Sequence, residues 1–355
     1  MLKQGKTRTL VKSTQLTLAC AMSLSISLFS LPSEAAQRWK LHSAYGQNVP
    51  VIGHTAQDIA NTITDLSHKE IRVKAFEPGA LVSGAHYFDA VSKGAITAAF
   101  GNAGYNVGKN SAYAFFAAVP FGPASAEYLA WLHYGGGQQL AEELYARDNI
   151  KFLACGIAPP ETSGWFVKEI KQVKDLKGLK MRFLGLGARV MEKLGVSTQL
   201  MAGGDIYPAL EIGTLDATEF SVPAVDRALG FYQIAKHNYF PGWHQQSTVQ
   251  ELLIHLDTWK SLTAQQQKLI ETVCLAQTTA MLAEGEALQF KAMQENAANG
   301  VINHRWPDEI LTSFKQAWDE VIDEEIKQNP DSRKIWRSYS DFRKNYSLWR
   351  DYGYL

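Results

Sequence analysis

Residues 178–250 bring together side chains that could hold a small carboxylic acid. Arg182 ends a predicted strand, and Gly185-Leu-Gly187 leads from it directly into a predicted helix. A helix N-terminus offers free backbone N–H groups and the positive end of the helix dipole. An arginine beside it can grip a carboxylate through two parallel hydrogen bonds. The alternative for Arg182 is a surface salt bridge, and the residues alone leave both uses open.

A carboxylate, Glu219, ends the predicted strand 215–220 and is expected to lie near Arg182. By itself, Glu219 is most simply used to neutralise Arg182. A carboxylate beside a bound acid would instead need a mediator, because two desolvated anions repel each other. Na⁺ or Ca²⁺ would serve, since such cations take oxygens from carboxylates, amides and backbone carbonyls. Glu161 and Gln245 could supply further oxygens.

Motifs of catalysis are absent from the sequence. It contains no G-x-S-x-G, no H-E-x-x-H, no P-loop and no paired C-x-x-C. The nine histidines show no metal-ligand spacing. Gly185-Leu-Gly187 also lacks the glycine or alanine, at Val190, that a dinucleotide-binding turn requires. We therefore expect a binding protein with no catalytic residues and no organic cofactor, and not an enzyme.

The first 36 residues predict a signal for export to the periplasm, cleaved near residue 36. A basic start is followed by an apolar run over 16–31 and by small residues at 33–36. The apolar run is shorter than the ~20 residues of a membrane-spanning helix, which favours cleavage over an anchor.

Charge and cysteine content narrow the partners of the mature chain. Removing residues 1–36 takes away four basic and one acidic side chain, which leaves 31 basic, 34 acidic and a net charge of −3. This charge excludes nucleic acid and anionic membrane surfaces as general partners. Cys155 and Cys274 remain, and an oxidising compartment permits a disulfide between them. One possible pair is no scaffold, so we expect buried free thiols.

Strands and helices alternate in the first part of the mature chain. Such alternation predicts a parallel sheet covered by helices on both faces. Ligands of such sheets lie beyond the carboxyl ends of the strands, which places Tyr45, Asn102 and Tyr105 at the mouth of a site. The predicted strands are 38–43, 71–76, 95–100 and 151–156, and the predicted helices are 53–68, 87–93 and 125–148, the last interrupted by glycines at 135–137.

A second lobe is expected after Pro159-Pro160, because the same alternation starts again there. Asp205 is a candidate N-cap in this lobe. The predicted strands are 179–184 and 215–220, the predicted helices are 188–194, 205–212 and 222–236, and strand 249–256 is expected to return the chain to the first lobe.

The rest of the chain is predicted to be helical. Thr263 could cap a helix that runs to about residue 298 and spans both lobes. Helix 308–328 follows. Beyond it, aromatic residues recur every three or four positions, which marks one helical face. That face packs either on its own chain or on a second subunit, and the pattern leaves both open. The aromatic residues are Trp336, Tyr339, Phe342, Tyr346 and Trp349.

Several segments together resemble one known family. The chain resembles the periplasmic solute receptors of TRAP (tripartite ATP-independent periplasmic) transporters, most closely the branch that binds α-keto acids and related monocarboxylates. The similarity covers essentially the whole mature chain. The segments are Phe88-Asp-Ala-Val-Ser-Lys-Gly94, Phe115-Phe-Ala-Ala-Val-Pro-Phe-Gly122, Tyr134-Gly-Gly-Gly-Gln138, Asp175-Leu-Lys-Gly-Leu-Lys-Met-Arg182, Asp216-Ala-Thr-Glu219 and Tyr239-Phe-Pro-Gly-Trp-His244.

The resemblance implies a two-lobed α/β fold of the periplasmic-binding-protein kind. Lobe I would comprise 37–160, completed by part of 249–300, and lobe II 161–248. The long helix 263–298 would cross both lobes, and a helical extension over 302–355 would form a homodimer. The resemblance also implies a receptor that delivers a small organic acid to membrane permease subunits. The alternatives on the same scaffold are a sensory receptor and a periplasmic enzyme acting on a carboxylic acid.

The resemblance also assigns roles in the site. Arg182 would pair with the carboxylate of the acid, and Tyr105 would form part of the pocket wall. Asn102 and Tyr45, from the first lobe, are further expected contacts of the acid. A bridging cation, Na⁺ or Ca²⁺, would be held by the residues Glu161, Glu219 and Gln245 and by the backbone carbonyl of Phe220.

Several positions depart from the pattern of that branch, among them the segment Ser221-Val-Pro-Ala-Val-Asp226, where Val-Gly-Pro-x-Asn-Asp is usual. Phe220 stands where a tryptophan is typical, so the wall of the pocket differs and the acid is left open. Gln245 replaces a glutamate while Glu161, which is also an expected contact of the acid, replaces a glutamine. These two changes would offset each other, so we expect the cation to be retained.

Overall fold

The computed structural model of the protein describes residues 36–354. The predicted export signal therefore lies outside the described residues, apart from Ala36. No helix within 36–354 is long and apolar enough to cross a membrane.

The first sheet has the order β2-β1-β3-β10-β4. β1, β2 and β3 are parallel, whereas β10 runs antiparallel to both β3 and β4. The strands of the predicted alternation therefore all run in one direction, as expected, whereas the returning strand β10 runs the other way because it re-enters this sheet from the second one and passes beside the outgoing strand β4. The strands are β1 (Gln37–Ser43), β2 (Ile71–Phe76), β3 (Ala98–Gly101), β4 (Ile150–Ala158) and β10 (Thr248–His255).

The second sheet has the order β11-β9-β5-β8-β6-β7. β6 is parallel to β7 and β8, while β5 is antiparallel to β8 and β9. Four of its strands were not predicted, because segments of three or four residues are too short to show an alternating pattern. The strands are β5 (Gly164–Phe166), β6 (Lys180–Arg182), β7 (Ser197–Gln199), β8 (Ala217–Thr218), β9 (His237–Phe240) and β11 (Ile302–Arg305).

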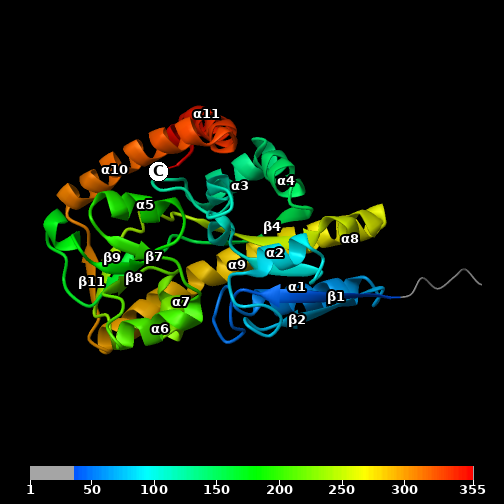
Figure 1. The fold of residues 1–355 in the computed structure, drawn as a ribbon, viewed down its shortest axis with the longest axis horizontal. Helices are drawn as coiled ribbons and strands as arrows, with labels where there is room; N and C mark the ends of the chain where they lie inside the picture. Colours follow the sequence, from blue (N-terminus) through cyan, green and yellow to red (C-terminus); the bar gives the residue numbers. More distant parts are fainter. Residues whose placement is uncertain (1–35, 355) are drawn as a thin grey trace, which may run out of the picture. The chain divides into compact units, whose positions relative to one another are not determined.

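The shorter helices flank the two sheets (Figure 1). Two predictions about them were wrong. Asp205 is not an N-cap, because the helix begins at Gly203 after Ala202, and Asp205 lies in its first turn. The helix predicted over 222–236 ends at Ala228, since Gly230 adopts a left-handed conformation with φ of 83°. The helices are α1 (Thr55–Leu66), α2 (Tyr87–Ser92), α3 (Ser125–Tyr134), α4 (Gly137–Ala146), α5 (Leu186–Lys193), α6 (Gly203–Glu211), α7 (Pro223–Ala228) and α8 (Leu256–Ser261).

Helix α9 (Ala264–Ala298) connects the two halves of the fold. Thr263 caps it, because its side chain accepts a hydrogen bond from the backbone N–H of Gln266, whose own side chain reaches back to Thr263. α9 packs on β4 and α1 of the first half and on α7 of the second half (Figure 1). A Cβ atom on Gly285 would lie 2.5 Å from Cδ of Pro159. The helix therefore passes in close contact with the crossing between the sheets.

Cys155 of β4 and Cys274 of α9 form a disulfide, with their Cα atoms 4.1 Å apart. The expected free thiols are therefore wrong. The packing of α9 on β4 places the two buried side chains face to face, a relation that the sequence does not reveal. The disulfide ties the long helix to a strand that leads out of the first sheet.

We expect the disulfide to contribute measurably to stability, because it links residues that are 119 positions apart. The paired substitutions Cys155→Ser and Cys274→Ser should lower the free energy of unfolding by about 2–4 kcal/mol. Urea denaturation of the oxidised protein and of the variant measures the difference. Dithiothreitol should destabilise the wild type and leave the variant unchanged; equal stability of the two proteins would contradict the prediction.

Two helices, α10 (Asp308–Gln328) and α11 (Pro330–Gly353), form the C-terminal extension (Figure 1). α10 packs on α5, and α11 packs on α3 and α4. The aromatic face of α11 divides into two parts. Tyr339 is buried and stacks edge to face with Trp131 of its own chain, whereas Trp349 is 58% exposed and Tyr352 is 85% exposed. The chain itself thus covers the first half of this face and leaves the end open.

Candidate functional site

A small cavity of about 10 Å³ lies where the two sheets face each other. Both halves of the fold line it. Of the eight predicted site residues, seven line the cavity and Glu219 lies directly behind Arg182. The lining residues are Tyr45, Ile52, Asn102, Tyr105, Glu161, Arg182, Leu184, Phe220, Ser221, Gln245, Thr248 and Gln250.

Strand ends explain why these distant residues converge. Asn102 directly follows β3, and Tyr45 lies two residues after β1. Arg182 is the last residue of β6, and Phe220 lies two residues after β8. Because neighbouring parallel strands end at the same edge of a sheet, each pair of residues meets at one edge. Glu161, which follows the crossing out of β4, lies between the two edges.

Arg182 and Glu219 form a fully buried ion pair. Nη1 of Arg182 lies 2.7 Å from Oε1 of Glu219 and also donates to the backbone carbonyl of Glu219 at 2.9 Å. Oε1 of Glu219 accepts a second hydrogen bond, from the backbone N–H of Leu184 at 2.6 Å. Burial is the largest single effect and would raise the pKa of Glu219, but the guanidinium of Arg182, His244 and the backbone N–H of Leu184 together outweigh burial and lower that pKa. The simpler of the two predicted uses of Glu219, neutralisation of Arg182, is therefore present.

The same ion pair limits how Arg182 can hold an acid. Nη1 is taken by Glu219, and Nε donates to the backbone carbonyl of Met201 at 3.3 Å. Within residues 36–354, Nη2 donates to no carboxylate or carbonyl oxygen. The sequence predicted two parallel hydrogen bonds from Arg182 to the acid, but only the N–H groups of Nη2 remain to donate to it. Burial raises the pKa of Tyr105. The nearby guanidinium of Arg182 acts in the opposite direction, but its effect is smaller.

Glu161 is 2% exposed, and only one of its two carboxylate oxygens accepts a hydrogen bond within the described residues. Its Oε1 accepts a hydrogen bond from the hydroxyl of Thr248 at 2.8 Å, whereas Oε2 has no donor among the described residues. Burial, followed by the negative charge of Glu219, raises the pKa of Glu161 well above its ordinary value. A carboxylate in this position calls for a positive partner.

Thr248 orients the amide of Gln245. The Gln245 side chain donates a hydrogen bond from Nε2 to Oγ1 of Thr248 at 2.8 Å. The Thr248 hydroxyl in turn donates a hydrogen bond to Oε1 of Glu161. Oε1 of Gln245 is therefore left without a donor within the described chain. Sequence reasoning missed Thr248, although it is the first residue of β10 and lies three positions after Gln245.

Three buried oxygens in this site have no hydrogen-bond donor within residues 36–354. They are Oε2 of Glu161, Oε2 of Glu219 and Oε1 of Gln245. Buried polar atoms without a partner are rare and need an explanation. One carboxylate oxygen each of Glu161 and Glu219 lies within 4.8 Å of the other and of a nitrogen of His244. Two ligands of one Ca²⁺ ion, bound at 2.3–2.6 Å, can be separated by up to about 5 Å. The oxygens therefore fit a cation.

His244 was not predicted as part of the site. Its Nε2 lies 3.6 Å from Oε2 of Glu219, and the side chain is 2% exposed. A search for regularly spaced histidines could not find it, because the other members of the cluster are carboxylates far away in the sequence. The one indication in the sequence that His244 belongs to the site is its position directly before Gln245.

Asp226 supports the segment that carries Phe220. It is fully buried and accepts hydrogen bonds from Nε1 of Trp165 at 2.7 Å and from the backbone N–H of Ser221 at 3.0 Å. Burial raises the pKa of Asp226 to about 7. Asp226 thereby fixes the chain on the lobe II side of the cavity.

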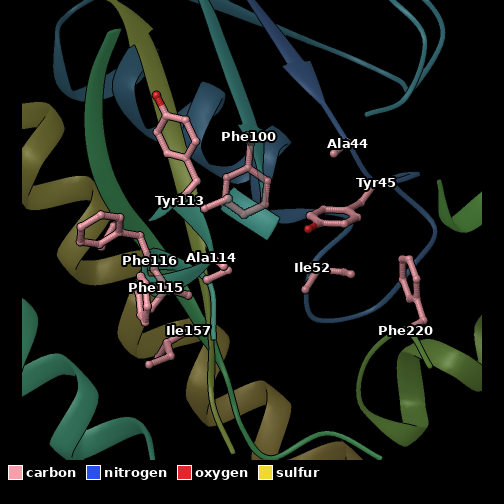
Figure 2. Packing of buried hydrophobic residues seen from close by; sticks show 14 of the residues in the cluster. Ala44, Tyr45, Ile52, Phe100, Tyr113, Ala114, Phe115, Phe116, Ile157 and Phe220 are labelled. Carbon is pink, nitrogen blue, oxygen red and sulfur yellow. The ribbon is translucent and has the colours of Figure 1, made fainter. Parts of the chain in front are cut away.

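Two aromatic rings separate the cavity from a larger cleft. Tyr45 and Phe220 meet edge to face, with ring centroids 6.5 Å apart, and Figure 2 shows them facing each other from the two halves of the fold. The hydroxyl of Tyr45 donates to Gln250 at 2.7 Å. On their far side lies a cleft of about 470 Å³, also lined by both rings. Its rim is narrow, because a Cβ atom on Gly84 would lie 2.9 Å from the Cβ of Ala202 across it.

Two α/β halves that close over a polar cavity define a solute-binding receptor. The chain belongs to the bacterial extracellular solute-binding proteins, family 7, whose pattern matches residues 42–329. The predicted resemblance and the predicted two-lobed α/β fold are thereby confirmed, and the family is one of receptors that act outside the cytoplasm.

Three relatives illustrate what the chain is similar to. It is 32% identical to the monocarboxylate 2-oxoacid-binding periplasmic protein of Nostoc sp., over 88% of this chain and 85% of the relative. A TRAP transporter solute-binding protein from Bordetella bronchiseptica, with calcium and picolinate, is 33% identical and has a TM-score of 0.87 over 88% of this chain and 94% of its own. One from Pseudoalteromonas atlantica, with sodium and pyruvate, is 29% identical, with a TM-score of 0.84 over 88% and 95%.

Proposed function

We propose that the protein is the periplasmic receptor of a TRAP-type transporter and binds a small 2-oxo or hydroxy carboxylate together with a cation. The observation that carries this proposal is the set of three donorless buried oxygens beside Arg182, of which two belong to residues that line the cavity and one belongs to Glu219 behind it. Relatives at about 30% identity bind pyruvate with sodium and picolinate with calcium. The receptor would reach the periplasm through cleavage near residue 36 and would deliver the acid to membrane permease subunits.

The residues divide into two groups. Nη2 of Arg182 would donate to the carboxylate of the acid, and Tyr45, Asn102, Tyr105, Glu161 and Phe220 would surround the acid. Glu161, Glu219, Gln245 and the carbonyl of Phe220 would hold the cation. Bound there, the cation would neutralise the buried carboxylates and draw in the oxygens of the acid. Because the two lobes, 37–160 with part of 249–300 and 161–248, both contact the acid, binding would favour the closed arrangement.

Calorimetry of the chelator-treated protein tests the proposal. Pyruvate should bind in the presence of Na⁺ or Ca²⁺ and should bind at least about tenfold more weakly in a choline buffer, because the donorless oxygens then repel the acid. The buffers should have equal ionic strength. Affinity that does not depend on the cation would contradict the cation site, and absence of binding for every small 2-oxo or hydroxy acid would contradict the receptor.

The ring pair of Tyr45 and Phe220 should limit the length of the acid. Phe220→Ala would join the inner cavity of about 10 Å³ to the outer cleft of about 470 Å³. We expect the affinity for 2-oxo-4-methylpentanoate, relative to that for pyruvate, to rise about tenfold in this variant, since an added methylene group contributes ~0.8 kcal/mol on burial. Leu229→Ala, which alters only the outer cleft, is the control and should leave the ratio unchanged. An unchanged ratio in Phe220→Ala would contradict the role of the rings.

The open end of α11 supports a homodimer. Leu348, Trp349 and Tyr352 are each more than half exposed, and exposed apolar clusters mark interaction surfaces. Replacing Trp349 and Tyr352 with aspartate should convert a dimer to a monomer in sedimentation experiments. Replacing the exposed Lys344 and Asn345 with aspartate is the matched control. A wild type that sediments as a monomer at micromolar concentration would contradict the dimer.

A further inference from the structure

The two halves of the fold meet directly at the rim of the cleft. A Cβ atom on Gly84, from the first half, would lie 2.9 Å from the Cβ atom of Ala202, from the second half. Both residues line two clefts, of about 370 and about 470 Å³. Tyr105 lines the first cleft, Tyr45 and Phe220 line the second, and all three rings also line the inner cavity. The contact therefore lies between the two clefts that border the cavity.

The segment that carries Ala202 is attached to two side chains of the cavity. The backbone carbonyl of Met201 accepts a hydrogen bond from Nε of Arg182 at 3.3 Å. On the other side of Ala202, a Cβ atom on Gly203 would lie 2.6 Å from Cζ of Phe220. Arg182 and Phe220 both line the inner cavity. The position of Ala202 at the rim is therefore tied to the position of the residues that would hold the acid.

The loop that carries Gly84 is braced within the first half of the fold. Nε2 of the buried His42, on β1, donates to the backbone carbonyl of Gly84 at 3.1 Å. The backbone N–H of His86 donates to the carbonyl of Ser83, and the two side chains are hydrogen-bonded at 2.8 Å. The φ angle of Gly84 is not positive, so its backbone does not require glycine. What excludes a side chain there is the contact with Ala202.

We infer that Gly84 and Ala202 form the contact that ends the closure of the receptor on its acid, and that the missing side chain at Gly84 sets how far the halves close. The inference rests on the proposed function. Binding favours the arrangement in which both halves contact the acid, so a group that holds the halves apart must weaken binding. Neither residue lines the inner cavity, so both act by positioning the halves. Because the segment of Ala202 is bonded to Arg182, an acid held by Arg182 also aligns the rim.

The substitution Gly84→Ala and a compensating change test the contact. Calorimetry of the full mature chain with pyruvate and Ca²⁺ should show at least about tenfold weaker binding in Gly84→Ala, because facing Cβ atoms cannot rotate away and overpacking is costly. Adding Ala202→Gly removes the opposing Cβ atom, and glycine is accepted at this N-cap position. The double variant should bind pyruvate within about threefold of the wild type. Gly204→Ala is the matched control and should bind normally, because it lines the same cleft and no atom of the described residues lies within 4 Å of its Cβ position.

Two calorimetric results would overturn the inference. One is an affinity in Gly84→Ala equal to that of the wild type. The other is a double variant that binds as weakly as Gly84→Ala, because the loss would then come from the loop and not from the contact with Ala202.

A pair of cysteines reports the contact without an affinity measurement. The paired substitutions Gly84→Cys and Ala202→Cys should cross-link on mild oxidation, and faster with pyruvate than without, because the Cβ atoms of a disulfide lie about 3.8 Å apart. Absence of the cross-link, or equal rates in a protein that binds pyruvate, would overturn the inference. A wild type that binds no small 2-oxo or hydroxy acid would contradict the proposed function instead, and formation of the cross-link would then decide whether the rim contact exists.

Discussion

Arg182→Met should abolish high-affinity binding of the acid. The guanidinium is 1% exposed and is the positive side chain of the cavity that can face a carboxylate. Removing one partner of a buried, hydrogen-bonded charge pair costs about 2–5 kcal/mol of binding, which is a loss of roughly 30-fold to several thousandfold in affinity. Calorimetry with pyruvate in the presence of Ca²⁺ measures the loss.

The same substitution also leaves Glu219 buried without its partner. We therefore expect a stability loss of about 3–5 kcal/mol, because the uncompensated carboxylate remains at 0% exposure. Arg182→Lys separates the two effects, since it keeps a charge for Glu219 but lacks the forked geometry of the guanidinium. Arg227→Met, at a partly buried ion pair with Glu295 outside the cavity, is the control for loss of an arginine. Affinity in Arg182→Lys equal to that of the wild type would contradict the role of Arg182.

The stability of the protein should fall between pH 5 and pH 8, and Glu251→Gln should remove part of this fall. Glu251 is fully buried on β10. Burial raises the pKa of its carboxyl group to about 7 from the ordinary value of 4.5, against the effect of hydrogen bonds from Tyr145 and Tyr87. At a pH below the pKa that Glu251 has in the unfolded chain, its carboxyl group is protonated in both states, and its full contribution to stability is present. As the pH rises, the unfolded state ionises first, so stability is lost up to about pH 7.

The expected size of this effect is roughly 3 kcal/mol, since one pKa unit corresponds to about 1.36 kcal/mol. Urea denaturation at pH 5 and pH 8 should show a drop in the wild type that is smaller by about this amount in Glu251→Gln. Glu271→Gln, at a partly exposed position on α9, is the control. An equal drop in wild type and Glu251→Gln would contradict the assigned pKa. Asp226, whose pKa is also about 7, should account for part of the drop that remains.

Long periodic segments were predictable from the sequence. The helix predicted over 308–328 has those bounds, and α9 begins one residue after its predicted cap, Thr263. Strand 71–76 also has its predicted bounds. In each case the apolar period or the capping residue is local, so tertiary contacts do not override it. The short strands of the second sheet lack such a signal and owe their conformation to their neighbours.

The composition of the cavity was predictable, whereas its internal bonding was not. Residues at strand ends converge by topology, which is why Tyr45, Asn102 and Arg182 line one cavity. The sequence left two uses of Glu219 open, and only the side-chain geometry, with the two charged groups 2.7 Å apart, decides for the contact with Arg182. Thr248 is hydrogen-bonded to both Glu161 and Gln245, and this link can be recognised only when the positions of all three side chains in space are known. The disulfide between Cys155 and Cys274 was likewise not predictable, because it depends on how α9 packs on β4.

Native mass spectrometry of the mature protein, incubated with pyruvate and Ca²⁺, tests the central claim most directly. We expect each chain to gain the mass of one acid and one Ca²⁺ ion together, and a chelator to remove both. We further expect Arg182→Met to gain no acid. Retention of the acid after the metal has been removed, or no gain in mass with any small 2-oxo or hydroxy acid, would contradict the account.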